Sequence, residues 1–252
     1  MPSIFDSPEF NERLFFPRRD ANPPPPDAQD RLIEVAGARL HLRWHRSLPL
    51  APTVLLFHGN GEVVSDYDDS AETFAAAGAN LAVVDYRGYG RSSGTPSLRA
   101  IIADAPLVAD AVAAEAPDLV IMGRSLGSAC AAELYSRAPR SVRAFIWESG
   151  FVDLAALISR RGLSPLAGLS ESDLAAFDAC AKLRRGHHPL LVLHGEQDSL
   201  IVPEEARRAF AEAGTTQKTL VWIPGHGHND LSLAPTYWRA MARLLGGRPA
   251  AV

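Results

Sequence analysis

Short apolar runs that alternate with alanine-rich stretches constrain the fold of this chain most strongly. The runs are rich in Val, Leu and Ile, while the stretches between them, such as residues 70–78 and 99–116, have helical spacing. Apolar strands that alternate with helices form a mostly parallel sheet covered by helices on both faces. The apolar runs begin at Thr53, Asn80, Asp118, Val142, Pro189 and Lys218.

The segments around this core complete the predicted organisation. Two strands with a turn at Gly37 are predicted over residues 31–46, as a hairpin, which makes a sheet of about eight strands. We expect one α/β domain over residues 31–252. Residues 1–30 contain four consecutive prolines and are interpreted as an extended N-terminal arm. The Phe and Leu side chains before these prolines are expected to pack on the domain. A separate partner-binding arm is the alternative. Residues 152–188 are interpreted as a small lid, with an ordinary crossover as the alternative.

Composition and charge exclude several classes of protein. A formal net charge of -4 gives no indication of a nucleic-acid partner, and two cysteines do not make a disulfide framework. The N-terminus lacks the features of a secretory signal, and no apolar run is long enough to span a bilayer. We therefore expect a soluble, cytoplasmic protein without integral membrane association. The oligomeric state is not predicted.

The strongest local motif is Gly123-Arg124-Ser125-Leu126-Gly127, between an apolar run and a small-residue helix. Ligands of open parallel sheets bind beyond the carboxyl ends of the strands. A serine on a sharp strand-to-helix turn has a strained backbone, and glycines two residues away on both sides remove the collisions that side chains would make. The following helix start offers free N–H groups. We predict that Ser125 is a nucleophile.

Two further strand ends carry the partners that such a serine needs. Asp198 follows the run that begins at Pro189 and can hold an imidazole in one tautomer. His226 and His228 lie on a glycine-rich loop after the last strand, and we favour His228 as the base because it abuts the next helix. Two histidines with one residue between them, and no further Cys or His nearby, do not supply a metal site.

The loop "HGNGE" after the first long apolar run is interpreted as half of an oxyanion hole. A tetrahedral intermediate needs backbone N–H donors, and those of Asn60 and Leu126 are suitably placed. His58 is expected to brace the loop. A phosphate cradle is the competing interpretation, but the G-x-x-x-x-G-K-[ST] pattern is missing.

The order Ser125, Asp198, His228 resembles the triad of the α/β-hydrolase superfamily. The resemblance rests on "FHGNGE", "DYRGYGRSSGTPS", "GRSLG", "HGEQDSLIVP" and "GHGHND", from about Arg31 to the C-terminus. It is to the serine-hydrolase branch of small-lid esterases, which includes lysophospholipase-like, acylglycerol-lipase-like, depalmitoylase-like and serine aminopeptidase-like members. It implies an α/β-hydrolase fold with Ser125 as nucleophile, His228 as base and Asp198 as orienting acid. Glu148 is the alternative acid, because some hydrolases place theirs in that region.

The expected activity is hydrolysis of a small-molecule carboxylic ester or thioester through an acyl-enzyme, with acyl lipids as a candidate substrate class. No metal or organic cofactor is expected. A peptidase, a C–C hydrolase and a cofactor-free perhydrolase use the same triad and remain alternatives. A hydrolase-fold protein that binds a ligand without turnover is the alternative outside enzymes.

Overall fold

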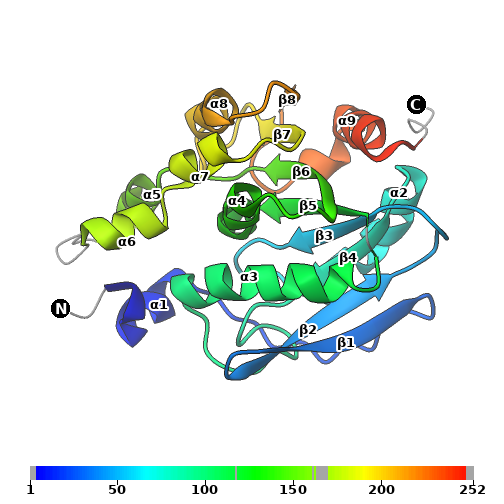
Figure 1. Cartoon of the computed structure of the whole chain (residues 1–252), viewed down its shortest axis with the longest axis horizontal. Coiled ribbons are helices and arrows are strands. Elements are labelled where there is room, and N and C mark those ends of the chain that lie inside the picture. The colour runs from blue at the N-terminus through cyan, green and yellow to red at the C-terminus, as the bar shows by residue number, and fades with distance from the viewer. Residues whose placement is uncertain (1–3, 117, 161, 163–169, 248–252) are drawn as a thin grey trace.

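The computed structural model describes residues 4–116, 118–160, 162 and 170–247 and has a central twisted sheet (Figure 1). Within these residues the sheet has eight strands in the order β1-β2-β4-β3-β5-β6-β7-β8. The β1–β2 hairpin is antiparallel and joins β4 in antiparallel register, and all other neighbours are parallel. The predicted α/β fold and the mostly parallel sheet are confirmed. The strands are β1 (Ala28–Val35), β2 (Ala38–His45), β3 (Thr53–Phe57), β4 (Asn80–Val84), β5 (Leu119–Arg124), β6 (Val142–Glu148), β7 (Leu190–Gly195) and β8 (Lys218–Ile223).

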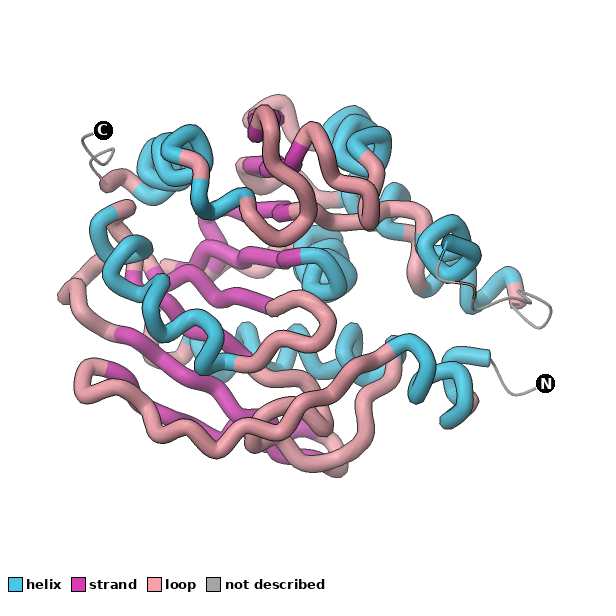
Figure 2. Tube along the Cα trace, turned by 180° about the vertical axis from the view of Figure 1, so that it is seen from behind, coloured by secondary structure: helices cyan, strands magenta, loops and turns pink. Residues whose placement is uncertain are grey.

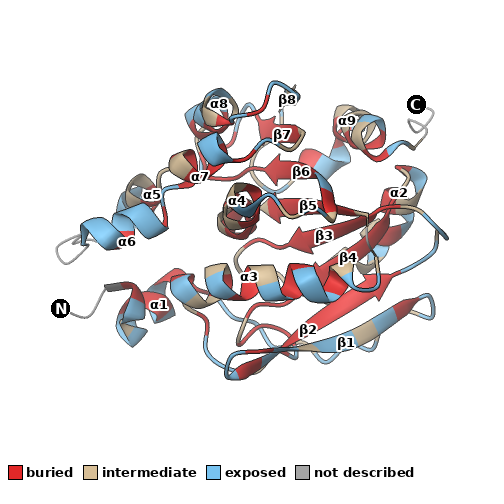
Figure 3. Cartoon of the chain, viewed as in Figure 1, coloured by how far each residue is buried: buried red, intermediate tan, exposed pale blue. Residues whose placement is uncertain are grey.

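Helices cover both faces of the sheet, as the fully apolar strands require. Alternate residues of β3 enter different cores: Leu55 and Phe57 pack with one set of helices, and Val54 and Leu56 with the other. Figure 3 shows the central strands buried and the helices buried mainly on their inner sides. The first core is covered by α3 (Leu98–Ala113), α4 (Ser128–Arg137), α7 (Ala179–Arg185) and α8 (Pro203–Glu212), and the second by α2 (Ala71–Ala76) and α9 (Pro235–Leu245).

The segment predicted as a lid is mostly helical where the structure describes it. It contains α5 (Leu154–Arg160) and α6 (Glu171–Ala176) and ends in α7, which packs on α4. The loop between α5 and α6 falls largely outside the described residues, so the lid interpretation stays a prediction. Among the described helices, none is both long and apolar enough to cross a bilayer.

The N-terminal arm, defined here as residues 4–27, begins with a 3-10 turn (Ile4–Asp6) and α1 (Pro8–Leu14). Ser7 caps α1 by accepting a hydrogen bond from the Phe10 N–H, and Pro8 occupies the first helical position. Beyond α1 the arm is extended, and β1 begins at Ala28, inside the segment predicted as arm. Helices α1 and α6 lie on the same side of the molecule, to which the strands β3 and β5 point (Figures 1 and 2).

Candidate active site

The turn after β5 holds Ser125 in the strained conformation that its flanking glycines predict. The φ of Ser125 is +50°, a left-handed value that non-glycine residues rarely adopt. A Cβ at Gly123 would lie 2.6 Å from the Gly127 carbonyl oxygen, and one at Gly127 would lie 1.9 Å from the Phe57 carbonyl oxygen. Gly123 therefore lets the turn close on itself, and Gly127 lets the start of α4 approach β3.

Ser125, His228 and Asp198 form a continuous chain of hydrogen-bonding contacts, although they come from three separate loops. His228 Nε2 lies 2.9 Å from Ser125 Oγ, and His228 Nδ1 lies 2.8 Å from Asp198 Oδ2. A carboxylate at Nδ1 holds the proton on that nitrogen, which leaves Nε2 free to accept the serine proton.

The Asp198 carboxylate is buried and remains anionic. Burial alone would raise its pKa, but the hydrogen bond from His228, the charge of that imidazole and the Ile201 N–H lower the pKa of Asp198 below its ordinary value. Its Oδ1 accepts hydrogen bonds from the backbone N–H groups of Leu200 and Ile201, at 2.9 and 2.8 Å. These donors fix the carboxylate orientation independently of His228.

The two alternatives left open by the sequence lie in other positions. His226 Nδ1 contacts the Pro224 carbonyl oxygen at 2.8 Å, on the same loop as His228. Glu148, the alternative acid, contacts Arg124 Nε at 3.3 Å with one carboxylate oxygen and accepts a hydrogen bond from Tyr237 with the other. The geometry brings His228 and Asp198, rather than these two residues, to Ser125.

Arg124 is a site residue that the sequence analysis did not identify. Its guanidinium forms ion pairs with Glu62 and Glu148 and donates to Asn229 Oδ1 at 2.9 Å, next to His228. One side chain therefore connects the nucleophile turn to the loops that carry Asn60 and His228. The available signal was a charged residue at the end of the apolar strand "LVIMGR".

The two carboxylates that pair with Arg124 are also held by neutral donors. Glu62 Oε2 accepts hydrogen bonds from the Gly59 N–H and the Tyr67 hydroxyl, both at 2.6 Å. Burial raises the pKa of Tyr67 and of Tyr237 well above the ordinary value, so both hydroxyls stay protonated and donate. Burial likewise raises the pKa of Glu148, in spite of the neighbouring guanidinium. This network of ion pairs and hydrogen bonds connects the segments around Ser125.

The two predicted oxyanion donors come from different segments of the chain. Leu126 is the second residue of the turn that starts the helix, where backbone N–H groups have no intrahelical acceptor. Asn60 is in the loop after β3, and its side chain contacts the N-terminal arm and Tyr89. His58 lies below this loop, where Nδ1 contacts the Gly59 carbonyl oxygen at 2.8 Å, as expected for a bracing residue.

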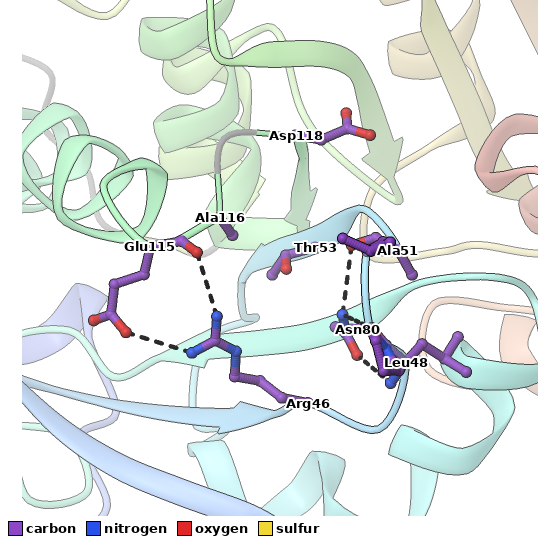
Figure 4. Close-up of a pocket in the computed structure, with 10 residues that line it drawn as sticks. Arg46, Leu48, Ala51, Thr53, Asn80, Glu115, Ala116 and Asp118 are labelled. Atoms are coloured by element: carbon purple, nitrogen blue, oxygen red, sulfur yellow. Dashed lines mark hydrogen bonds and ion pairs between the residues drawn. The ribbon is translucent and has the colours of Figure 1, made fainter.

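A separate cavity of about 400 Å³ lies at the opposite, amino end of the sheet (Figure 4). Its lining includes Asn80, which exchanges two hydrogen bonds of 2.9 Å with the Leu48 backbone, and Arg46, which pairs with Glu115. These polar side chains already form hydrogen bonds and an ion pair within the protein. In the part of the chain that the structure describes, no group of three or more His, Cys, Asp or Glu side chains could hold a metal ion.

Comparisons with known proteins agree with the fold. Residues 49–172 and 174–232 match the model of the family described as serine aminopeptidase, S33. The α/β-hydrolase domain-containing protein WAV2 of Arabidopsis thaliana is 30% identical over 83% of this chain and 75% of its own length. The protein bem46 of Schizosaccharomyces pombe is 28% identical over 77% of this chain and 67% of its own. The solved structure of the Pyrococcus furiosus esterase Pf2001 superposes with a TM-score of 0.74 at 18% identity, over 91% of this chain and 98% of that one.

Proposed function

Because the chain belongs to the serine aminopeptidase S33 family of the α/β-hydrolase superfamily, we propose that it is a serine hydrolase of carboxylic esters or thioesters. The observation that carries this proposal is the contact chain from Asp198 through His228 to Ser125. A serine hydroxyl is a weak nucleophile unless an oriented base removes its proton, and this arrangement supplies such a base.

In the proposed reaction, His228 Nε2 accepts the Ser125 proton while Ser125 Oγ attacks the acyl carbonyl carbon. The backbone N–H groups of Asn60 and Leu126 donate to the oxyanion of the tetrahedral intermediate. His228 then gives the proton to the departing alcohol or thiol, which leaves an acyl-enzyme on Ser125. Water, deprotonated by His228, attacks this ester and releases the carboxylic acid. Asp198 stabilises the imidazolium at both stages.

The pairing of the charged side chains next to the Ser125 turn favours an ester or thioester over an aminopeptidase substrate. An aminopeptidase has to bind the α-ammonium group of its substrate, and a carboxylate is the usual partner for such a charge. Glu62 and Glu148 are both engaged by Arg124 and by tyrosine hydroxyls. We therefore place the peptidase second.

An apolar crevice supports an apolar acyl group in the proposed substrate. It lies between α3, the start of α4 and the inserted helices. Apolar side chains at a site favour apolar ligand groups through the burial of surface. Residues that line it include Ile102, Ala129, Phe151, Leu154 and Phe177.

The nucleophile is tested with a fluorophosphonate probe, which phosphonylates activated serines. We expect labelling of the wild type and none of Ser125→Ala. A folded wild type that is not labelled would favour a ligand-binding protein, and labelling that persists in Ser125→Ala would refute the assignment.

The acyl group is tested with p-nitrophenyl acetate, butyrate, octanoate and palmitate. We expect kcat/KM to rise from acetate to octanoate, because a chain that parts the inserted helices from α3 and α4 buries its methylene groups among these apolar side chains. Without a ligand the crevice has a volume of only about 10 Å³. If acetate is cleaved far better than octanoate, the proposal of an acyl-lipid substrate is wrong.

A further inference from the structure

The N-terminal arm lies outside the family match, which begins at residue 49, yet its first part belongs to the hydrophobic core. Phe5, Leu14 and Phe15 are at most 2% exposed, whereas Phe16 is 56% exposed. Phe15 and Leu14 share the core cluster that contains Leu126, the residue after the nucleophile. The arm is therefore a fixed part of the domain at the end of the sheet where Ser125 lies.

The arm meets the oxyanion loop through the side chain of Asn60. Asn60 Nδ2 donates to the Leu14 carbonyl oxygen at 2.7 Å, and Asn60 Oδ1 accepts from the Phe16 N–H at 2.9 Å. The Tyr89 hydroxyl donates to the same Oδ1 at 2.6 Å. Three hydrogen bonds thus fix the side-chain amide of the residue whose own backbone N–H is the proposed oxyanion donor.

The N-terminal end of the arm contacts the inserted helices. The Phe5 ring packs edge-on against Phe177, with centroids 4.5 Å apart. Arg99 of α3 forms ion pairs with Asp6, at 2.9 Å, and with Asp173 of α6. Residues 5–16 of the arm therefore contact both the insert and the oxyanion loop.

We propose that the arm is a positioning element of the active site, which uses the Asn60 side chain to hold the backbone N–H of Asn60 at the oxyanion. This inference rests on the proposed hydrolase function. An oxyanion donor works only when it is preorganised, because its contribution is lost if the loop has to reorder during the reaction. Two backbone groups of the arm, the Leu14 carbonyl and the Phe16 N–H, provide that order.

The first test compares Asn60→Ala with Asn80→Ala. Both changes remove an amide side chain that forms two hydrogen bonds with backbone groups of another segment. Asn80, however, lines the separate cavity at the amino end of the sheet (Figure 4). We expect Asn60→Ala to lower kcat for a p-nitrophenyl ester about 10–100-fold, with KM changed less than about 3-fold, because removal of one oxyanion donor outright costs about 10²–10³-fold. Asn80→Ala should keep the wild-type kcat. Rates are measured at 15 °C, and Tm is recorded for each variant.

A transition-state analogue separates positioning from general destabilisation. A trifluoromethyl ketone forms an oxyanion on the serine, so its Ki should rise by about the same factor as kcat/KM falls in Asn60→Ala. A fall in kcat of less than fivefold, or a fall that Asn80→Ala shares at equal loss of Tm, would overturn the inference.

The arm is tested directly at position 16, which also covers the case that Asn60→Ala does not fold. Phe16→Pro removes the N–H that donates to Asn60, and Phe16→Ala removes the same exposed ring but keeps the N–H. We expect kcat of the proline variant to be at least fivefold below that of the alanine variant. Equal kcat values would overturn the role of the arm while leaving the proposed function intact. If the wild type is not labelled by the fluorophosphonate probe, the proposed hydrolase function itself is wrong.

Discussion

Replacement of Arg124 by methionine is expected to destabilise the fold strongly and in a pH-dependent way. Methionine keeps much of the volume of the side chain but removes the charge that two carboxylates share. Glu62 is 23% exposed and keeps its hydrogen bonds from Tyr67 and Gly59. Glu148 is 7% exposed and keeps only the Tyr237 hydroxyl among the partners described above. The cost therefore falls mainly on Glu148.

The magnitude follows from the burial of this carboxylate. Removal of one partner of a buried ion pair costs about 3–5 kcal/mol, because a charge remains in a medium that solvates it poorly. We expect a loss of this size in the free energy of unfolding at pH 8. In the double variant Arg124→Met with Glu148→Gln, about 0.5–3 kcal/mol of the lost stability should return, which is the range of coupling energies between contacting residues.

The sign of the pH dependence follows from the raised pKa of Glu148. Burial raises the pKa of this carboxyl in the folded state above its unfolded value of about 4.3, so the folded state binds more protons in the interval between the two. Stability therefore falls as pH rises through that interval. Without Arg124 the folded pKa of Glu148 rises further and the interval widens, so the variant should lose less stability at pH 5 than at pH 8.

The assay is urea unfolding followed by tryptophan fluorescence at pH 5 and pH 8. Arg31→Met is the matched control, because Arg31 pairs with Glu115 at the surface and both side chains are about 40% exposed. Exposed pairs contribute about 0–1 kcal/mol, so this control should change little at either pH. If Arg124→Met loses less than about 1 kcal/mol at pH 8, or the same amount at both pH values, the reasoning is refuted.

Three further predictions concern Asp198, Gly127 and Cys130. Asp198→Asn should lower kcat about 10³–10⁴-fold, and an unchanged kcat would contradict this. Because the pKa of Asp198 is depressed in the folded state, the variant should also be less stable than the wild type at pH 7, by an amount that shrinks below about pH 4. A difference in stability that does not change with pH would contradict this second expectation. Gly127→Ala places a Cβ 1.9 Å from the Phe57 carbonyl oxygen and should cost about 3 kcal/mol or more in urea unfolding, which a wild-type midpoint would exclude. Cys130 is fully buried and burial raises the pKa of its thiol, so it should not react with a disulfide reagent at pH 8 until urea unfolds the protein.

The sheet could be predicted from the sequence because its signals are local. An apolar run such as residues 119–122, followed by glycine, serine and small residues, specifies a strand, a turn and a helix within a short stretch of chain. The glycines beside Ser125 were predictable for the same reason, since one of their two constraints arises within the turn. The other, against Phe57 on the neighbouring strand, needed the fold.

The remaining site features depend on contacts between distant segments. Within "GHGHND" the sequence favours His228 over His226 only because His228 abuts the next helix. Which of the two reaches Ser125 depends on how the loop docks on the end of β7. There, a Cβ at Gly195 would lie 2.3 Å from the Gly227 carbonyl oxygen, so the close approach requires glycine. The partners of Arg124 and of Asn60 lie on separate loops, and neither pairing leaves a periodic pattern in the sequence. Such contacts become visible only once the chain has been folded.

The contact between Phe5 and Phe177 has a consequence for the order in which the chain can fold. Phe5 is synthesised long before its partner, because its ring packs against a residue 172 positions later in the chain. During translation, the apolar side chains of the arm remain without that partner until most of the sheet has left the ribosome. Closing so long a loop carries an entropic cost that must be met before the contact stabilises anything. Docking of the N-terminal end of the arm on Phe177 is therefore expected to be a late step of folding. The contacts of Leu14 and Phe16 with Asn60 join residues only 46 and 44 positions apart, so they can form earlier.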